Sequence, residues 1–189
     1  QESKKDEFVN KFIEKTKKLK IGNGMEQDVQ LGPITTLKRL GEIEELVEIT
    51  KKEGAKVLIG GKRPSGFNKG YFYEPTVFDD VDDNFTIMKT EPFGPLVPIL
   101  SFKSFDEVVE RANNNDLGLC SYIYTNSMEK AHKASELMET GCVAVNTPTV
   151  AIAEAPFGGI KQTGYGREGG SMATKDYLNI KYTHLGLKT

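Results

Sequence analysis

The sequence contains no tryptophan, only two cysteines and two histidines, and no long hydrophobic run. Cys120 and Cys142 lie outside any C-x-x-C pattern, which excludes a secreted disulfide scaffold and a zinc ribbon. Both stand in aliphatic runs, so we expect buried thiols that are not nucleophiles. His132 and His184 have no partner at metal-ligand spacing, and no metal site is predicted. Because no apolar run approaches the roughly 18 residues that span a bilayer and no signal peptide is present, we expect no membrane association and a cytoplasmic location.

An excess of one charge is also absent. Lysine and arginine number 25 and aspartate and glutamate 27, so the net charge of -2 gives no basic surface that favours nucleic acid. Hydrophobic residues make up 38% of the 189 residues, which is typical of a globular domain with a sizeable core. The chain begins with Gln1 rather than methionine, from which we expect a piece of a longer protein.

Hydrophobic periodicity predicts alternating helices and strands along most of the chain. Helices are predicted over residues 6–18 and 36–53, after the N-caps Ser104 and Asn126, and near residues 170–177. Strands are predicted over residues 55–59, 71–78, 96–102, 119–124, 142–145 and 179–184. Helices of this length between short apolar strands are typical of an α/β fold, here with a mainly parallel sheet and helices on both faces.

Residues 164–169, GYGREG, fit the pattern G-x-G-x-x-G, which in dinucleotide-binding folds brings backbone amides close to a pyrophosphate. This stretch follows no predicted strand directly, and no acidic residue after Asp176 stands where a ribose would need one. The pattern therefore favours a glycine-rich loop that needs positive φ angles. A free-standing dinucleotide-binding domain stays an alternative, and it requires this loop to hold phosphate.

An acidic stretch resembles a calcium loop without matching it. Asp80, Asp82, Asn84 and Glu91 have the spacing of four ligand positions, but Phe85 replaces the glycine that the loop needs for its turn. The sequence therefore favours a solvated acidic turn.

Two loops each hold one phenylalanine between proline and glycine residues. In residues 91–95, EPFGP, the carboxylate of Glu91 can accept hydrogen bonds from hydroxyl groups, and the ring of Phe93 can lie against a planar heterocycle. The same loop can equally be a turn whose Phe93 fills the core. Residues 155–159, APFGG, present Phe157 in a similar setting within a long connection, a length typical of functional loops. The residues alone leave both readings open.

At these two motifs the sequence resembles the C-terminal part of the aldehyde dehydrogenase superfamily, and the resemblance runs from end to end. It is carried in order and spacing by residues 32–33, 54–61, 70–77, 91–95, 111–114 with 118–119, 145–146 and 155–168. Within the superfamily, residues 154–159, 164–170 and 177–187 look most like succinate-semialdehyde dehydrogenase and related semialdehyde enzymes.

The resemblance implies an NAD(P)-dependent oxidation of an aldehyde, or a semialdehyde such as succinate semialdehyde, to the carboxylic acid through a cysteine thioester. The nucleophilic cysteine and the base glutamate would lie upstream of Gln1, so no catalytic residue is expected in this chain. Glu91 matches the residue that binds the nicotinamide-ribose hydroxyls, and Phe93 matches the aromatic beside the nicotinamide. Phe157 matches an aromatic of the aldehyde tunnel, and Ala151 matches a specificity position in the preceding loop.

The resemblance also implies a domain organisation. Residues 1–178 would be an N-terminally truncated catalytic domain, and residues 179–189 a C-terminal strand that extends toward the oligomerisation region of a neighbouring subunit. The parent protein would be a homo-oligomer, a dimer or a tetramer, that binds NAD or NADP and a small-molecule aldehyde. The chain alone would be inactive and would bind the cofactor weakly. The alternative function is a non-catalytic α/β interaction module of the same fold.

Overall fold

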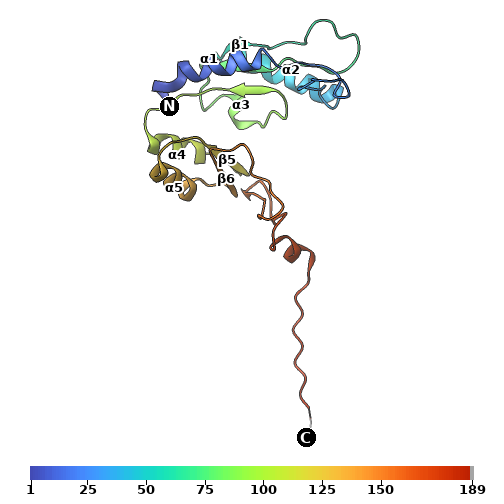
Figure 1. Cartoon of the computed structure of the whole chain (residues 1–189), viewed down its shortest axis with the longest axis vertical. Coiled ribbons are helices and arrows are strands. Elements are labelled where there is room, and N and C mark those ends of the chain that lie inside the picture. Colours follow the sequence, from blue (N-terminus) through green and yellow to red (C-terminus); the bar gives the residue numbers. More distant parts are fainter. Residues whose placement is uncertain (188–189) are drawn as a thin grey trace. The chain divides into compact units, whose positions relative to one another are not determined.

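The computed structural model describes residues 1–187 as an α/β chain that divides into two compact units, the first Gln1–Phe105 and the second beginning at Asp106 (Figure 1). The helices are α1 Lys5–Thr16, α2 Leu37–Lys52, α3 Thr86–Lys89, α4 Phe105–Asn113 and α5 Met128–Leu137, with 3-10 turns at Glu2–Lys4 and Ala173–Tyr177. The strands are β1 Lys56–Ile59, β2 Thr76–Asp79, β3 Leu96–Pro98, β4 Leu117–Gly118, β5 Cys120–Ile123, β6 Cys142–Val145 and β7 Ile160–Lys161.

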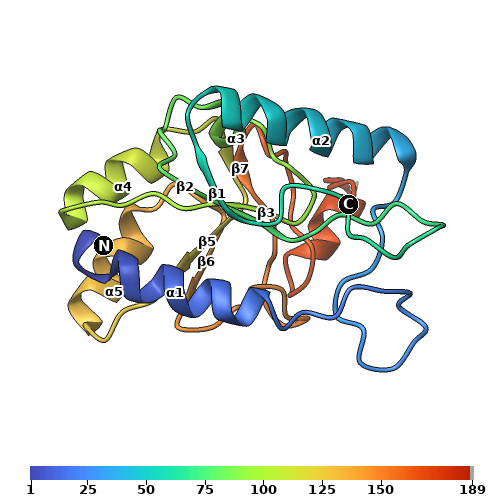
Figure 2. The same cartoon turned by 90° about the horizontal axis from the view of Figure 1, so that it is seen from above.

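Helix α2 and a three-stranded sheet form the core of the first unit. The hydroxyl of Thr36 caps the helix by accepting a hydrogen bond from the Arg39 amide at 3.1 Å. The helix lies along strands β1, β2 and β3, of which β1 pairs antiparallel and β3 parallel with β2 (Figure 2). Its apolar side chains pack against Phe78 of β2, and the fully buried ones are Leu40, Ile43 and Val47.

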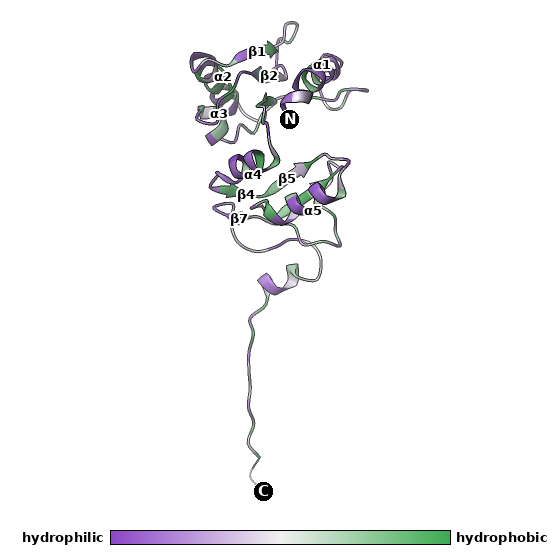
Figure 3. Ribbon diagram, turned by 90° about the vertical axis from the view of Figure 1, so that its left-hand side faces the viewer, coloured by the Kyte–Doolittle hydropathy of each residue, from purple (hydrophilic) through white to green (hydrophobic). Residues whose placement is uncertain are grey.

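Two polar contacts attach the remaining helices of the first unit. The carboxylate of Glu53, at the end of α2, accepts hydrogen bonds from the amide and the hydroxyl of Thr86 at 3.0 and 2.6 Å, and so holds the start of α3. On α1, the ammonium group of Lys5 lies 2.6 Å from the carboxylate of Asp79 in β2. Most of α1 is hydrophilic and exposed (Figure 3), and even Phe8 on its apolar side is 54% exposed.

The second unit contains a β-α-β unit and a short antiparallel pair. Strands β5 and β6 pair in parallel on either side of α5 in the sequence, as the periodicity predicted. The helix is capped by the hydroxyl of Ser127, which accepts from the Lys130 amide, so the prediction of Asn126 as the cap was wrong by one residue. Strands β4 and β7 pair antiparallel, and β7 follows the loop that holds Phe157.

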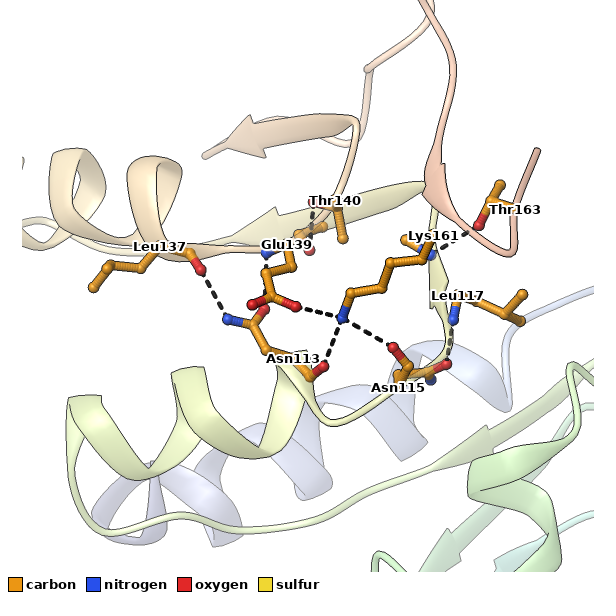
Figure 4. Close-up of polar contacts among 10 residues, drawn as sticks. Asn113, Asn115, Leu117, Leu137, Glu139, Thr140, Lys161 and Thr163 are labelled. Carbon is orange, nitrogen blue, oxygen red and sulfur yellow. Dashed lines mark hydrogen bonds and ion pairs between the residues drawn. The ribbon is translucent and has the colours of Figure 1, made fainter. Parts of the chain in front are cut away.

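A network of polar contacts joins β7 to the ends of α4 and α5 (Figure 4). The ammonium group of Lys161 donates to the carbonyls of Asn113 and Asn115 at 2.7 and 2.9 Å and lies 2.5 Å from the Glu139 carboxylate. The amide side chain of Asn113 donates to the Leu137 carbonyl at 2.8 Å and accepts from the Glu139 amide at 2.8 Å. A cation at the C-terminal end of α4 is also favoured by the helix dipole.

The α/β class is confirmed, but the single mainly parallel sheet with helices on both faces is wrong for the described residues. The strands form three small sheets, one mixed, one antiparallel and one parallel. Two predicted strands are also shorter than expected. Pro75 has no amide to donate, so the predicted strand 71–78 starts only at Thr76. The predicted strand 96–102 ends at Pro98.

The end of the chain differs from the prediction as well. A helix was predicted near residues 170–177, but the structure has only the 3-10 turn Ala173–Tyr177 there. Residues 178–187 are exposed and contain no strand, because no second segment within the described residues pairs with them (Figure 1). Residues 188–189 of the predicted C-terminal strand lie outside the described residues. None of the helices found in residues 1–187 has the length and apolar character needed to cross a bilayer.

Candidate functional site

The loop 91–95 presents an acid and an aromatic ring to solvent in the first unit. The Glu91 side chain is exposed, and its carboxylate contacts no other group among the described residues. The Phe93 ring is 74% exposed, which excludes the reading in which it fills the core. Its backbone has a φ of 36°, in the left-handed region that residues other than glycine rarely adopt. Strain of this kind is common at ligand-binding and active sites.

Contacts from α2 and β2 hold this loop. The guanidinium group of Arg39 donates to the backbone carbonyls of Glu91 and Pro92, the former at 3.3 Å, and its central carbon lies 6.0 Å from the centre of the Phe93 ring. Gly94 lies against α2 so closely that an added Cβ would come within 2.5 Å of Ile43. The loop is therefore held firmly while the carboxylate of Glu91 stays available.

A hollow borders the exposed ring. It has a volume of about 400 Å³ and is lined by residues 31–35 together with Phe93, Gly94 and Pro95. Its walls come from one glycine-proline loop and from the loop 91–95, both within the first unit. A flat ring bound against Phe93 would lie in this hollow, with its hydroxyl groups able to donate to the carboxylate of Glu91.

The second candidate aromatic lies in the second unit. Phe157 is partly buried, and its amide and carbonyl both bond to the backbone of Glu168, at 2.6 and 2.7 Å. It lines a hollow of about 590 Å³ together with Leu119, residues 158–159, residues 163–168 and residues 176–177. Ala151 is exposed and does not line this hollow, so the structure does not bring Ala151 and Phe157 together in one cavity.

The glycine pattern at residues 164–169 is a turn and not a phosphate loop. Gly164, Gly166 and Gly169 have positive φ angles, as the sequence predicted. The Arg167 amide, which a phosphate would need, already donates to the carboxylate of Asp176 at 2.8 Å. A carboxylate in that position repels phosphate, so the reading as a free-standing dinucleotide-binding domain has no support here.

Cys120 and Cys142 are free thiols that lie opposite each other in the parallel strands β5 and β6. Both are only partly buried, so the prediction of buried thiols was wrong. Burial nonetheless raises the pKa of the Cys120 thiol, with a smaller contribution from Cys142. The thiol of Cys142 donates to the carbonyl of Gly158 at 3.6 Å. A thiol whose ionisation is disfavoured makes a poor nucleophile, which agrees with the prediction for Cys120.

Sequence reasoning missed Arg39, which is the residue that contacts every part of the Glu91–Phe93 segment. Its separation from the loop by 52 and 53 positions left no local signal. One indication was present in the sequence. A basic residue in the first turn of a helix opposes the helix dipole, and this usually means that its charge has another partner.

Comparisons with known proteins agree along most of the chain. The profile of the aldehyde dehydrogenase family matches residues 1–183. The chain is 45% identical to aldehyde dehydrogenase 1A1 of Bos taurus over 181 residues, which are 96% of this chain and 36% of that protein. It is 41% identical to the mitochondrial succinate-semialdehyde dehydrogenase of Arabidopsis thaliana over 182 residues, which are 96% of this chain and 34% of that protein.

The solved structures give the same result. The structure of an aldehyde dehydrogenase from Bacillus cereus in complex with NAD⁺ matches with a TM-score of 0.94 and 39% sequence identity, over 98% of this chain and 38% of that one. The chain therefore spans roughly a third of the length of the curated relatives it matches.

Proposed function

The chain belongs to the aldehyde dehydrogenase family, and on that premise we propose that it is the C-terminal part of an enzyme that oxidises an aldehyde to the carboxylic acid with NAD or NADP. The chain supplies one side of the cofactor site and one side of the aldehyde site. The proposal assigns the cysteine that attacks the aldehyde and the glutamate that activates water to parts of the protein outside this chain. When bound, the cofactor accepts a hydride from the aldehyde carbon.

The observation that carries this proposal is the loop 91–95. It presents an unpaired carboxylate on Glu91 and a 74% exposed ring on Phe93, two residues apart, on a backbone held by Arg39. The carboxylate accepts hydrogen bonds from the two hydroxyls of a ribose, and the ring packs against the adjacent nicotinamide. Both contacts fix the position of the nicotinamide relative to the aldehyde, and position controls the rate of hydride transfer.

The aldehyde is assigned to the side of the second unit, where Phe157 lines a hollow of about 590 Å³ and supplies an apolar wall. A semialdehyde such as succinate semialdehyde is the substrate class we propose to test first, because succinate-semialdehyde dehydrogenase is among the relatives. The methyl side chain of Ala151, at the proposed specificity position, can donate no hydrogen bond to a substrate carboxylate. A semialdehyde would therefore need its carboxylate partner elsewhere in the protein.

The proposal also includes a homo-oligomer, a dimer or a tetramer, located in the cytoplasm. Residues 178–187 support the oligomer, because the exposed Leu178, Ile180 and Tyr182 alternate with polar residues along the sequence, a pattern typical of a strand that lacks its partner.

The test uses the complete protein that carries this chain, mixed with NAD or NADP and a series of aldehydes that includes succinate semialdehyde. We expect NAD(P)H to form in proportion to the aldehyde consumed. Glu91→Gln should slow hydride transfer more than aldehyde capture, because a neutral amide holds the ribose less firmly, and a misplacement near one ångström reduces the rate roughly 100-fold. The isotope effect with a deuterated aldehyde should therefore increase.

Glu26→Gln is the matched control, because it neutralises another exposed carboxylate of the first unit that does not line the hollow beside Phe93. If the complete protein forms no NAD(P)H with any aldehyde, the proposal is wrong and a non-catalytic module becomes the better reading. If Glu91→Gln leaves both rate and isotope effect at parent values, Glu91 has no role in cofactor binding.

A further inference from the structure

We infer that Arg39 is a positioning residue for the cofactor. It does not need to touch the nicotinamide or the ribose itself. It holds the backbone from which Glu91 and Phe93 reach them. This inference rests on the proposed function for its catalytic consequence, but its structural half can be tested without any cofactor.

The contacts of Arg39 follow the loop residue by residue. One terminal nitrogen donates to the carbonyls of both Glu91 and Pro92, and the central carbon of the guanidinium group lies 6.0 Å from the centre of the Phe93 ring. The other terminal nitrogen donates to the carboxylate of Glu42 at 2.7 Å. Glu42 stands three residues further along the same helix, so it fixes the direction in which the guanidinium group points.

The place of Arg39 in α2 favours this role over a purely structural one. It is in the first turn of the helix, where its amide donates to the capping hydroxyl of Thr36, and that turn contains no acidic residue. A cation there is disfavoured by the dipole of the helix. The carbonyls of Glu91 and Pro92 and the carboxylate of Glu42 offset this unfavourable interaction with the helix dipole. The loop therefore supplies two of the groups that stabilise the Arg39 charge.

The planar guanidinium group suits this task better than an ammonium group. Its five N–H donors have a fixed geometry, so it can bind two successive carbonyls and a carboxylate at once while its face lies near an aromatic ring. The carbonyls that it binds immediately precede Phe93, which has a φ of 36°. Arg39 thus opposes relaxation of a strained segment, and its loss should let the Glu91 carboxylate and the Phe93 ring move.

The first experiment measures the loop in this chain by amide hydrogen exchange, comparing Arg39→Met with Lys38→Met. Methionine keeps the length and the helix propensity and removes the donors. The amides of Thr76 and Leu96, which donate to the carbonyls of Pro95 and Gly94, report on the loop. We expect them to exchange roughly tenfold faster in Arg39→Met, since a hydrogen bond from a charged donor is lost.

Lys38→Met is the matched control. Lys38 is one residue earlier, its side chain is 88% exposed, and it contacts Glu42 only at 3.8 Å. The amide of Val47, in the core of α2, is the internal reference for general unfolding. Unchanged exchange at Thr76 and Leu96 in Arg39→Met would overturn the inference, and so would an equal acceleration at Val47.

The second experiment uses the complete protein and measures the isotope effect and the kcat and KM values for NAD(P) and the aldehyde. We expect Arg39→Met to reduce the rate of hydride transfer roughly tenfold, within the range that small positioning errors produce. Lys38→Met should leave it unchanged. Because Arg39 acts through Glu91 and Phe93, Arg39→Met added to Glu91→Gln with Phe93→Ala should be little slower than those two substitutions without it.

The two experiments distinguish a failure of the positioning role of Arg39 from a failure of the proposed function. If the parent oxidises aldehydes but Arg39→Met does so at the parent rate, the positioning role is wrong while the proposed function stands. If Arg39→Met and the pair Glu91→Gln with Phe93→Ala multiply their effects in the triple variant, Arg39 acts through neither side chain and the inference is wrong. If the parent itself shows no NAD(P) reduction, the proposed function has failed, and the exchange rates still decide whether Arg39 holds the loop.

Discussion

The first compact unit buries large side chains completely, whereas the second buries only small ones. Phe78, Leu40 and Ile43 are at most 1% exposed in the first unit. In the second unit, the buried apolar residues among those described are Ala131, Ala134 and Ala144, while Tyr122 and Leu137 are at least half exposed. The first unit is thus stabilised mainly by its own core, and the second by backbone pairing and polar networks such as that of Lys161.

This difference bears on function. The loop 91–95, the proposed cofactor site, is attached to the well-packed unit, so its strain at Phe93 is supported by a helix with a buried apolar face. The hollow beside Phe157 belongs to the unit with little core, which suits a surface that other parts of the protein complete. The exposed apolar residues of the second unit are consistent with the proposed enzyme, in which further chain and a neighbouring subunit would cover them.

The largest effect is expected from opening the core of the first unit. Phe78→Ala should reduce the free energy of unfolding by about 3–5 kcal/mol, because Phe78 is fully buried against α2 and no neighbour can fill the space. Urea denaturation, monitored by hydrogen exchange in α2, measures this loss. A loss below about 1 kcal/mol would mean that the first unit is not held by this core.

A titration of Tyr73 would sharpen the comparison further. Burial, with smaller contributions from the carboxylates of Glu44 and Glu48, raises the pKa of Tyr73 from 10.0 to about 12. Above pH 10 the unfolded chain loses this proton before the folded one does, so this contribution to the stability of the first unit is complete below pH 10 and falls between pH 10 and 12.

Absorbance of tyrosinate measures the ionisation, and urea denaturation at several pH values measures the stability. Tyr73→Phe should abolish the late ionisation and flatten this part of the stability curve. An unchanged titration in Tyr73→Phe would show that another tyrosine ionises late and that the environment of Tyr73 is wetter than the structure indicates.

Disrupting the polar network of the second unit should reduce the free energy of unfolding by a smaller amount. Lys161→Met removes two hydrogen bonds to the carbonyls of Asn113 and Asn115 and the contact with Glu139, and we expect a loss of about 1–2 kcal/mol. Lys133→Met, which removes an exposed ion pair on α5, is the control and should change stability by less than about 0.5 kcal/mol. Equal effects of the two substitutions would mean that Lys161 does not anchor β7.

Parts of this comparison could be predicted from the sequence. The stripe of Leu40, Ile43 and Val47 and the unit formed by β5, α5 and β6 follow from local periodicity, which sequence records directly. The single sheet was wrong because the pairing of strands depends on contacts between distant segments, and strands of two residues such as β7 carry almost no signal. Helix α3, with four residues, was missed for the same reason.

The candidate site, too, could be predicted only in part from the sequence. The loop 91–95 was recognised from its residues and its resemblance, but those residues left open whether Phe93 points into the core or into solvent. A contact made 52 positions away by Arg39 accompanies the exposed arrangement, and no local pattern encodes such a contact. The roles of Glu91, Phe157 and Ala151 stay predictions, since they depend on ligands and on further parts of the protein.

The smallest effect on stability, and the most informative about function, is expected at Phe157. Its partly buried ring lines a hollow, so Phe157→Ala in the complete protein should cost only about 1 kcal/mol, between the cost at a core site and at a surface site. Its loss should instead raise KM for the preferred aldehyde with little change in kcat, because a wall that contacts the bound aldehyde and the transition state equally contributes uniform binding. Thermal unfolding and KM across a series of aldehydes of increasing length measure the two effects together. A melting temperature lowered as far as in Phe78→Ala, with an unchanged order of substrates, would show that Phe157 is a core residue. The second unit would then also depend on a large buried side chain.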